Sequence, residues 1–169
     1  MTLDEEKLCI DRIIKDEGLR LKPYRDSVGK LTIGIGRNLD DVGISEQEAR
    51  FMLENDIGNV YVALDRQLSW WRKLDGVRQG VLVNMCFNLG INGLLGFKKT
   101  LAAIQFGDYE SAANGMLQSK WATQVGPRAV RISDMIKTLC LQIYLIQLSY
   151  KFLKIKSMSF CSIFYTLTL

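Results

Sequence analysis

The chain has 169 residues and a net charge of +4, from 22 Lys and Arg against 18 Asp and Glu. Every acidic residue lies within positions 1–138, and the remainder carries only the positive charges Lys151, Lys154 and Lys156, so the main body is nearly neutral and offers no basic face for nucleic acid. Because the sequence contains no histidine, imidazole catalysis, histidine-ligated zinc and Ser-His-Asp chemistry are excluded, which directs attention to the carboxylates.

The first predicted element is a helix over residues 4–16, in which apolar residues recur at roughly helical spacing, at Leu8, Ile10, Ile13 and Ile14. Gly18 follows where this helix is expected to stop. Between residues 19 and 37 the apolar period changes to two, and residues 26–29 supply a turn. We therefore expect a small antiparallel sheet, which needs a helix packed against it because two or three short strands are marginal alone.

Ser45 and Glu48 form a capping-box pattern that predicts a long helix over residues 45–68, about 36 Å in length. Glycines divide the rest into shorter predicted helices, near residues 75–89, 97–106, 108–116 and 127–137. The expected fold class is α+β and mainly helical, with a small mixed lobe, a long connecting helix and a helical lobe. We expect a cleft between the two lobes.

The segment 139–169 differs in composition from the rest of the chain. It contains no Asp, Glu, Gly, Pro, Ala, Val, Asn or Arg, and is dominated by Leu, Ile, Phe, Tyr, Ser and Lys. One hypothesis is that it results from translation beyond a frameshift or a lost stop codon. The alternative is a genuine apolar helix that packs on the large lobe.

The cysteines and the apolar runs indicate the cellular compartment in which the chain is made. The spacing of Cys9, Cys86, Cys140 and Cys161 fits neither a CxxC metal pair nor a disulfide framework, and we expect reduced thiols at Cys9 and Cys86, which have apolar neighbours in the sequence. The acidic N-terminus is not a secretory signal, and no uncharged apolar run reaches the roughly 18 residues that span a membrane. The sequence implies cytoplasmic synthesis, no stable membrane insertion, and no metal or organic cofactor.

Three polar residues within a short stretch could carry chemistry. Glu17 ends the first helix, Asp26 lies on the predicted turn and Thr32 lies on the returning strand. Glycoside cleavage needs an acid to protonate the leaving oxygen and a second carboxylate across the sugar. A partly shielded Glu17 would have a raised pKa, while an exposed turn aspartate would stay ionised. Taken singly, each residue has a plainer interpretation, as a solvated glutamate, a turn former and a β former.

Together with its flanks, this stretch closely resembles the active-site region of the phage-type lysozymes, glycoside hydrolase family 24. The family pattern is a glutamate, eight residues, an aspartate, five residues and a threonine, and Glu17, Asp26 and Thr32 match it without a gap. The resemblance implies that Glu17 is the general acid, and that Asp26 and Thr32 position water for an inverting hydrolysis. The implied bond is the β-1,4 link between N-acetylmuramic acid and N-acetylglucosamine in peptidoglycan.

The resemblance runs from Ile10 to Thr138 and implies a catalytic domain over residues 1–138, with the small lobe at about 17–44 and residues 1–16 in the large lobe. It also implies that Asn84 and Asn88 face the sugar, although these amides could instead bridge helices. Where the family often has histidine, this chain has an arginine. Arg37 could contact carboxylates of the wall polymer, or it could pair with Asp40 or Asp41.

The three tryptophans could be read as platforms for sugar stacking. We assign Trp121 to the core of the large lobe because its flanks are helical. Trp70 and Trp71 close the long helix, and neither is assigned to substrate.

Two rival functions remain open from the sequence. A lytic transglycosylase also uses one glutamate, but would leave Asp26 and Thr32 without a task. The other rival is a noncatalytic or defective lysozyme-like domain that only binds the wall. The family setting implies a monomeric phage product that acts on peptidoglycan glycan strands after leaving the host cytoplasm through a partner pore protein.

Overall fold

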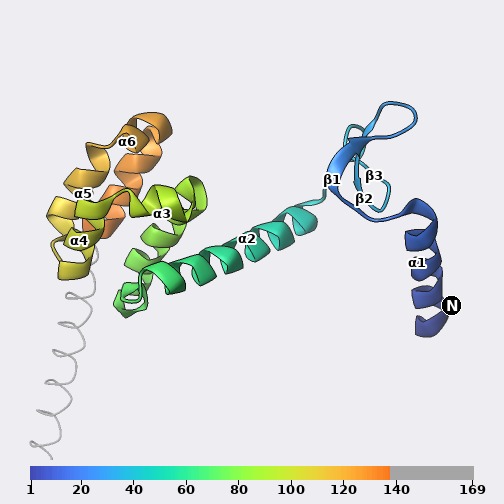
Figure 1. Cartoon of the computed structure of the whole chain (residues 1–169), viewed down its shortest axis with the longest axis horizontal. Helices are drawn as coiled ribbons and strands as arrows, with labels where there is room; N and C mark the ends of the chain where they lie inside the picture. The colour runs from blue at the N-terminus through green and yellow to red at the C-terminus, as the bar shows by residue number, and fades with distance from the viewer. Residues whose placement is uncertain (138–169) are drawn as a thin grey trace, which may run out of the picture. The chain divides into compact units, whose positions relative to one another are not determined.

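A computed structural model describes residues 1–137, and the predictions for the segment 139–169 lie outside this range. The chain divides into two compact units, the first from Met1 to Asn55 and the second from Asp56 onward. Each unit is considered by itself (Figure 1).

The first unit opens with helix α1, Leu3–Glu17. A capping box starts it, because the Thr2 hydroxyl accepts from the Glu5 amide and the Glu5 carboxylate accepts from the Thr2 amide. The helix stops where the sequence predicts, at Gly18, whose N–H donates to the Ile14 carbonyl (2.9 Å). No residue of α1 is buried.

The predicted sheet is confirmed as three antiparallel strands, β1 (Arg20–Arg25), β2 (Leu31–Gly34) and β3 (Arg37–Asn38), in the order β1-β2-β3. Thr32 lies on the central strand, opposite Tyr24 of β1 and Asn38 of β3. It is the one buried residue among residues 1–55.

Helix α2, Glu46–Gln67, begins at the predicted capping box. The Ser45 hydroxyl accepts from the Glu48 amide (3.2 Å), and the Glu48 carboxylate accepts from the Ser45 amide (2.7 Å). At 1.5 Å per residue its 22 residues extend about 33 Å. The boundary between the two units falls within this helix.

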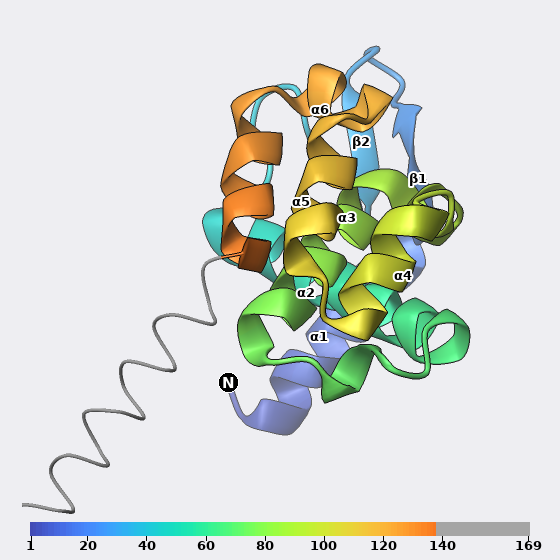
Figure 2. The ribbon, with the colours of Figure 1, turned by 90° about the vertical axis from the view of Figure 1, so that its left-hand side faces the viewer.

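The second unit is helical. After α2 it contains a 3-10 turn, η1 (Trp71–Lys73), and then α3 (Gly76–Leu95), α4 (Lys98–Phe106), α5 (Tyr109–Leu117), α6 (Lys120–Val125) and helical residues 127–137. Helix α4 packs against α5, and α5 contacts α6 (Figure 2). Every one of these segments contributes to one buried apolar core, which includes Leu64, Trp71, Leu82, Met85, Ile104, Met116, Trp121 and Ile136.

Two helical boundaries differ from the sequence prediction. The helix expected to end at residue 89 bends at Gly90, which has a φ of +69°, and then continues to Leu95 because Leu94 is fully buried in the core. A short further helix, α6, follows Ser119, whose hydroxyl accepts from the Ala122 amide. Pattern analysis missed both pieces because each is too short to show a period.

The fold class is therefore α+β and mainly helical, consistent with a lysozyme-like fold, as expected. The cleft between lobes and the assignment of residues 1–16 to the large lobe stay predictions. Within the described part of the chain no single helix is long and apolar enough to cross a membrane, although α3 and α4, which meet at 108°, pass that test as a pair.

Candidate active site

Glu17 is the last residue of α1, and its carboxylate lies against the connection between β2 and β3. Its Oε2 is 3.1 Å from the position that a Cβ on Gly36 would occupy. Gly36 has a φ of +72°, which side chains rarely tolerate, and any side chain there would crowd the carboxylate. Glu17 is exposed, so α1 and the sheet do not provide the partial shielding that the sequence analysis expects.

Asp26 builds the hairpin turn between β1 and β2. Its Oδ1 accepts from the amides of Val28 (3.0 Å) and Lys30 (2.9 Å), and its own amide donates to the Lys30 carbonyl (3.0 Å). Within residues 1–137, Oδ2 of Asp26 takes part in no hydrogen bond or ion pair. The turn-forming role is therefore real, and it leaves one carboxylate oxygen uncommitted.

Thr32 occupies the centre of the sheet with 3% of its surface exposed. Its hydroxyl donates to the Lys30 carbonyl (3.2 Å), which leaves the oxygen lone pairs as acceptors. Because Asp26 also bonds to Lys30, the two predicted site residues share this residue as a backbone partner.

Glu17, Asp26 and Thr32 thus come from three elements of the same unit, as the sequence predicts. Glu17 contacts the β2–β3 connection, and Asp26 and Thr32 flank Lys30. Among the described residues, no hydrogen bond or ion pair joins the three side chains to one another. Their convergence on a single substrate groove stays a prediction.

Of the two alternatives for Arg37, the pairing with Asp40 or Asp41 is wrong, and contact with the wall polymer is untested. Its guanidinium pairs with Glu48 at the start of α2 (2.7 Å), and with neither Asp40 nor Asp41. Both aspartates are already engaged, since Asp40 accepts from the Leu31 amide (2.9 Å) and Asp41 pairs with Lys30 (2.8 Å).

The capping box holds the Glu48 carboxylate ready to receive this arginine. Hydrogen bonds from the Ser45 backbone and hydroxyl lower the pKa of Glu48, with a smaller contribution from the Arg37 charge. The sequence pattern identifies Glu48 only as a capping residue. The pattern that defines a cap gives no sign of a third partner.

Asn84 and Asn88 both bridge helices in the second unit. The Asn84 Oδ1 accepts from Arg128 (2.7 and 3.1 Å), and the Asn88 Oδ1 accepts from the Trp121 indole N–H (2.8 Å). Both asparagines are exposed, and each retains an NH2 group that can donate to a ligand. The two amides therefore do bridge helices, which is the alternative that the sequence leaves open. Their contact with substrate stays a prediction.

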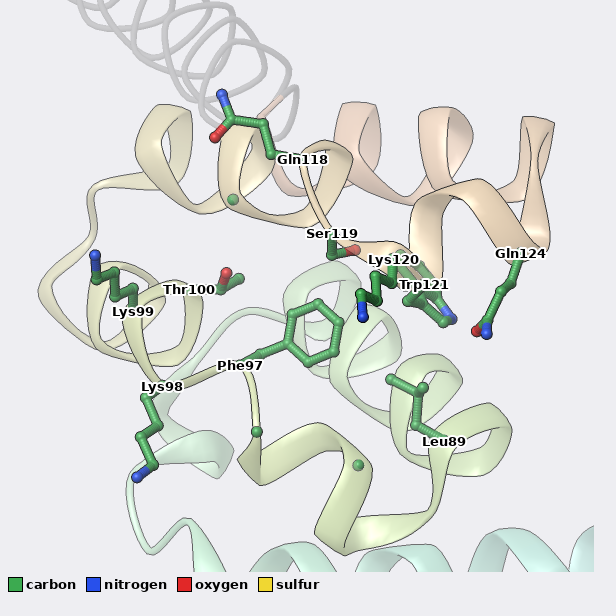
Figure 3. Close-up of a pocket in the computed structure, with 13 residues that line it drawn as sticks. Leu89, Phe97, Lys98, Lys99, Thr100, Gln118, Ser119, Lys120, Trp121 and Gln124 are labelled. Atoms are coloured by element: carbon green, nitrogen blue, oxygen red, sulfur yellow. The ribbon is translucent and has the colours of Figure 1, made fainter.

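The second unit also contains a cavity of about 740 Å³. Phe97 points toward Trp121 across it (Figure 3), and the two rings meet edge to face with centroids 6.2 Å apart. Trp121 is buried, as predicted, and it also lines the cavity. Lysines and small polar residues complete the lining, among them Lys98, Lys99, Lys120, Thr100 and Ser119.

Comparisons with known proteins show which proteins this sequence is similar to. A family model described as phage lysozyme matches residues 14–138. A protein of Dictyostelium discoideum named probable T4-type lysozyme 1 is 28% identical, over 79% of this chain and 96% of its own length. An endolysin of Acyrthosiphon pisum secondary endosymbiont phage 1 is 28% identical, over 81% of this chain and 92% of its own. The pre-baseplate central spike protein Gp5 of Enterobacteria phage T4 is 30% identical over 77% of this chain, which spans only 28% of that protein.

Proposed function

The chain belongs to the phage lysozyme family, and on this premise we propose that it is an endolysin that hydrolyses bacterial peptidoglycan. The bond cleaved is the β-1,4 link between N-acetylmuramic acid and N-acetylglucosamine, and the anomeric configuration is inverted. The catalytic domain spans residues 1–138.

In the proposed reaction, Glu17 protonates the glycosidic oxygen as the bond to the sugar carbon breaks. Water attacks that carbon from the opposite face and gives its proton to Asp26, whose Oδ2 is not committed to the turn. The Thr32 hydroxyl already donates to a carbonyl, so it accepts a hydrogen from the water and orients it. Asn84 and Asn88 are proposed to contact the substrate through their NH2 groups.

One observation carries this proposal above the others. The catalytic frame of the family, a glutamate, an aspartate and a threonine at fixed spacing, is complete in this chain, and all three residues belong to one compact unit. The Glu17 carboxylate also lies close to the backbone of Gly36, where a side chain would crowd it. A domain that only bound the wall would not need a carboxylate in this position.

The first test replaces the proposed acid. Glu17→Gln keeps the side-chain shape but removes the proton donor, so we expect lytic activity on outer-membrane-stripped bacteria to fall by roughly 10²–10⁴-fold. Glu6→Gln, the same change at another exposed position of α1, serves as the control and should keep full activity. A Glu17→Gln protein with wild-type activity would overturn the assignment. Mass spectrometry of the products separates hydrolysis from transglycosylation, because an anhydro product lacks one water.

The second test separates the two tasks of Asp26. Asp26→Asn retains an Oδ1 that can accept the Val28 and Lys30 amides, so the turn should persist while the ionised base is lost. We expect a loss of activity without a loss of stability. Asp26→Ala removes both the acceptor for the turn amides and the base. It should therefore lower activity and also destabilise the hairpin by about 1 kcal/mol.

We further propose that the protein accumulates as a monomer in the cytoplasm of a phage-infected host and reaches the wall through a partner pore protein. Cells that produce it alone should continue to grow, whereas cells that also produce a membrane-permeabilising protein should lyse. Rapid lysis by the chain alone would contradict the need for a partner.

A further inference from the structure

The pairing of Arg37 has a consequence for Glu17, because Arg37 directly follows the glycine on which the Glu17 carboxylate lies. Residues 35 and 36 connect β2 to β3, and the pairing of Ile33 with Arg37 closes this turn after Gly34, the last residue of β2. Gly34 and Gly36 both have positive φ, so this connection has wide conformational freedom of its own. The backbone against Glu17 is therefore placed by whatever holds Arg37.

Glu48 holds it. This carboxylate accepts from the Ser45 amide (2.7 Å) and hydroxyl (2.8 Å) through Oε2, and its Oε1 binds the Arg37 guanidinium (2.7 Å). An isolated surface pair gains little, because two long side chains must be ordered together. Here the cap has already ordered the carboxylate, so only the arginine loses freedom when the pair forms.

We propose that Arg37, through its ion pair with Glu48, is a positioning residue that fixes Gly36 and thereby the carboxylate of Glu17. The ion pair ties the β2–β3 connection to the first turn of α2. This inference rests on the proposed function, in which Glu17 is the acid. It assigns Arg37 a task that does not require contact with substrate.

The test is a double-mutant cycle in the full chain, with Arg37→Gln, Glu48→Gln and the double variant. Glutamine at position 48 still completes a capping box, so α2 keeps its start while the charge is lost. We expect each single variant to lower kcat on purified peptidoglycan about two- to fivefold with KM nearly unchanged, the range that one surface ion pair can supply. The double variant should be no worse than either single variant, because both remove one interaction. Arg37→Lys should recover part of the lost kcat.

Glu46 and Arg50 provide a matched control, since both partners of their ion pair (2.6 Å) belong to α2. Arg50→Gln should leave kcat unchanged. A substrate-binding arginine would behave differently, because Arg37→Gln would then raise KM while Glu48→Gln did nothing. That pattern, or additive effects of the two substitutions, would overturn the proposal.

A measurement independent of activity keeps the inference separate from the proposed function. In nuclear magnetic resonance spectra, the Gly36 amide and the Glu17 carboxyl carbon should shift in Arg37→Gln and Glu48→Gln, and stay unchanged in Arg50→Gln. Unshifted signals would overturn the positioning role even in an active enzyme. Shifted signals together with an active Glu17→Gln variant would reject the proposed function and leave the coupling intact.

Discussion

The two units of this chain are ordered by different interactions. In residues 1–55 Thr32 is the one buried residue, and the shape comes from caps, a hairpin turn and ion pairs at named positions. In the unit from Asp56 onward, every helical segment sends apolar side chains into a common core. The candidate catalytic residues all lie in the first unit, where directional bonds set the geometry and apolar burial contributes little.

This contrast predicts different effects for single substitutions in the two units. In the first unit, loss of one polar partner should shift a neighbouring group without unfolding the chain, as proposed for Arg37 and Glu17. In the second unit, removal of apolar volume should lower the free energy of unfolding. The three tryptophans, Trp70, Trp71 and Trp121, all lie in the second unit, so their fluorescence reports on that unit alone.

The largest expected effect comes from truncating the core. Leu82 is fully buried, and Leu82→Ala should lower the free energy of unfolding by about 2–5 kcal/mol, through lost transfer energy and a residual cavity. Leu21 on β1 is 80% exposed, and Leu21→Ala should change it by less than about 0.5 kcal/mol. Urea denaturation followed by tryptophan fluorescence, with circular dichroism for the whole chain, measures both. Equal losses of unfolding free energy at the two positions would contradict the contrast between the units.

The second-largest expected effect on the free energy of unfolding involves Arg78, a buried cation. Arg78 is 4% exposed, lies over the Tyr109 ring, pairs with Asp75 and donates to the Ile136 carbonyl (3.1 Å). Its Nη2 has no partner among the described residues. Asp75→Asn removes the compensating charge, so we expect a loss of about 2–3 kcal/mol in unfolding free energy at pH 7.

The same pair predicts a pH dependence. Burial opposes ionisation of Asp75, but hydrogen bonds from the Arg78 side chain and backbone and the Arg78 charge outweigh it, so the pKa of Asp75 is lowered. A carboxyl with a lowered folded pKa stabilises the protein above its unfolded pKa, about 3.9, and this contribution is lost as pH falls through the folded pKa. The stability gap between wild type and Asp75→Asn should therefore be constant near neutrality and shrink below about pH 4. A gap that persists or widens in acid would contradict this assignment.

The smallest effects distinguish the two bridging amides. Asn88→Ala leaves the partly buried Trp121 indole N–H without its acceptor, which should cost about 1–2 kcal/mol. Asn84→Ala frees only the half-buried Arg128, whose exposed part can bind water, and should cost less than about 0.5 kcal/mol in unfolding free energy. Both are measured by urea denaturation. The reverse order would mean that the Arg128 bridge, and not the indole bond, joins α3 to the closing helices.

Local patterns predicted much of the fold because their causes are local. The Ser45–Glu48 cap, the stop at Gly18 and the turn at Asp26 each involve residues at most four positions apart, so the sequence carries all the partners. The continuation of α3 beyond Gly90 could not be predicted in this way, since Leu94 is held by a core drawn from distant segments.

By itself, the sequence determined the fold class, the small antiparallel sheet, the long helix and the residues of the family frame at positions 17, 26 and 32. Only the tertiary structure decided that Arg37 binds Glu48, that Glu17 lies on Gly36 and that Asn88 holds Trp121. The physical reason is distance along the chain. Caps and turns join near neighbours in the sequence. In contrast, the acid with which an arginine pairs depends on which segments folding brings together, and so does the backbone that a carboxylate contacts.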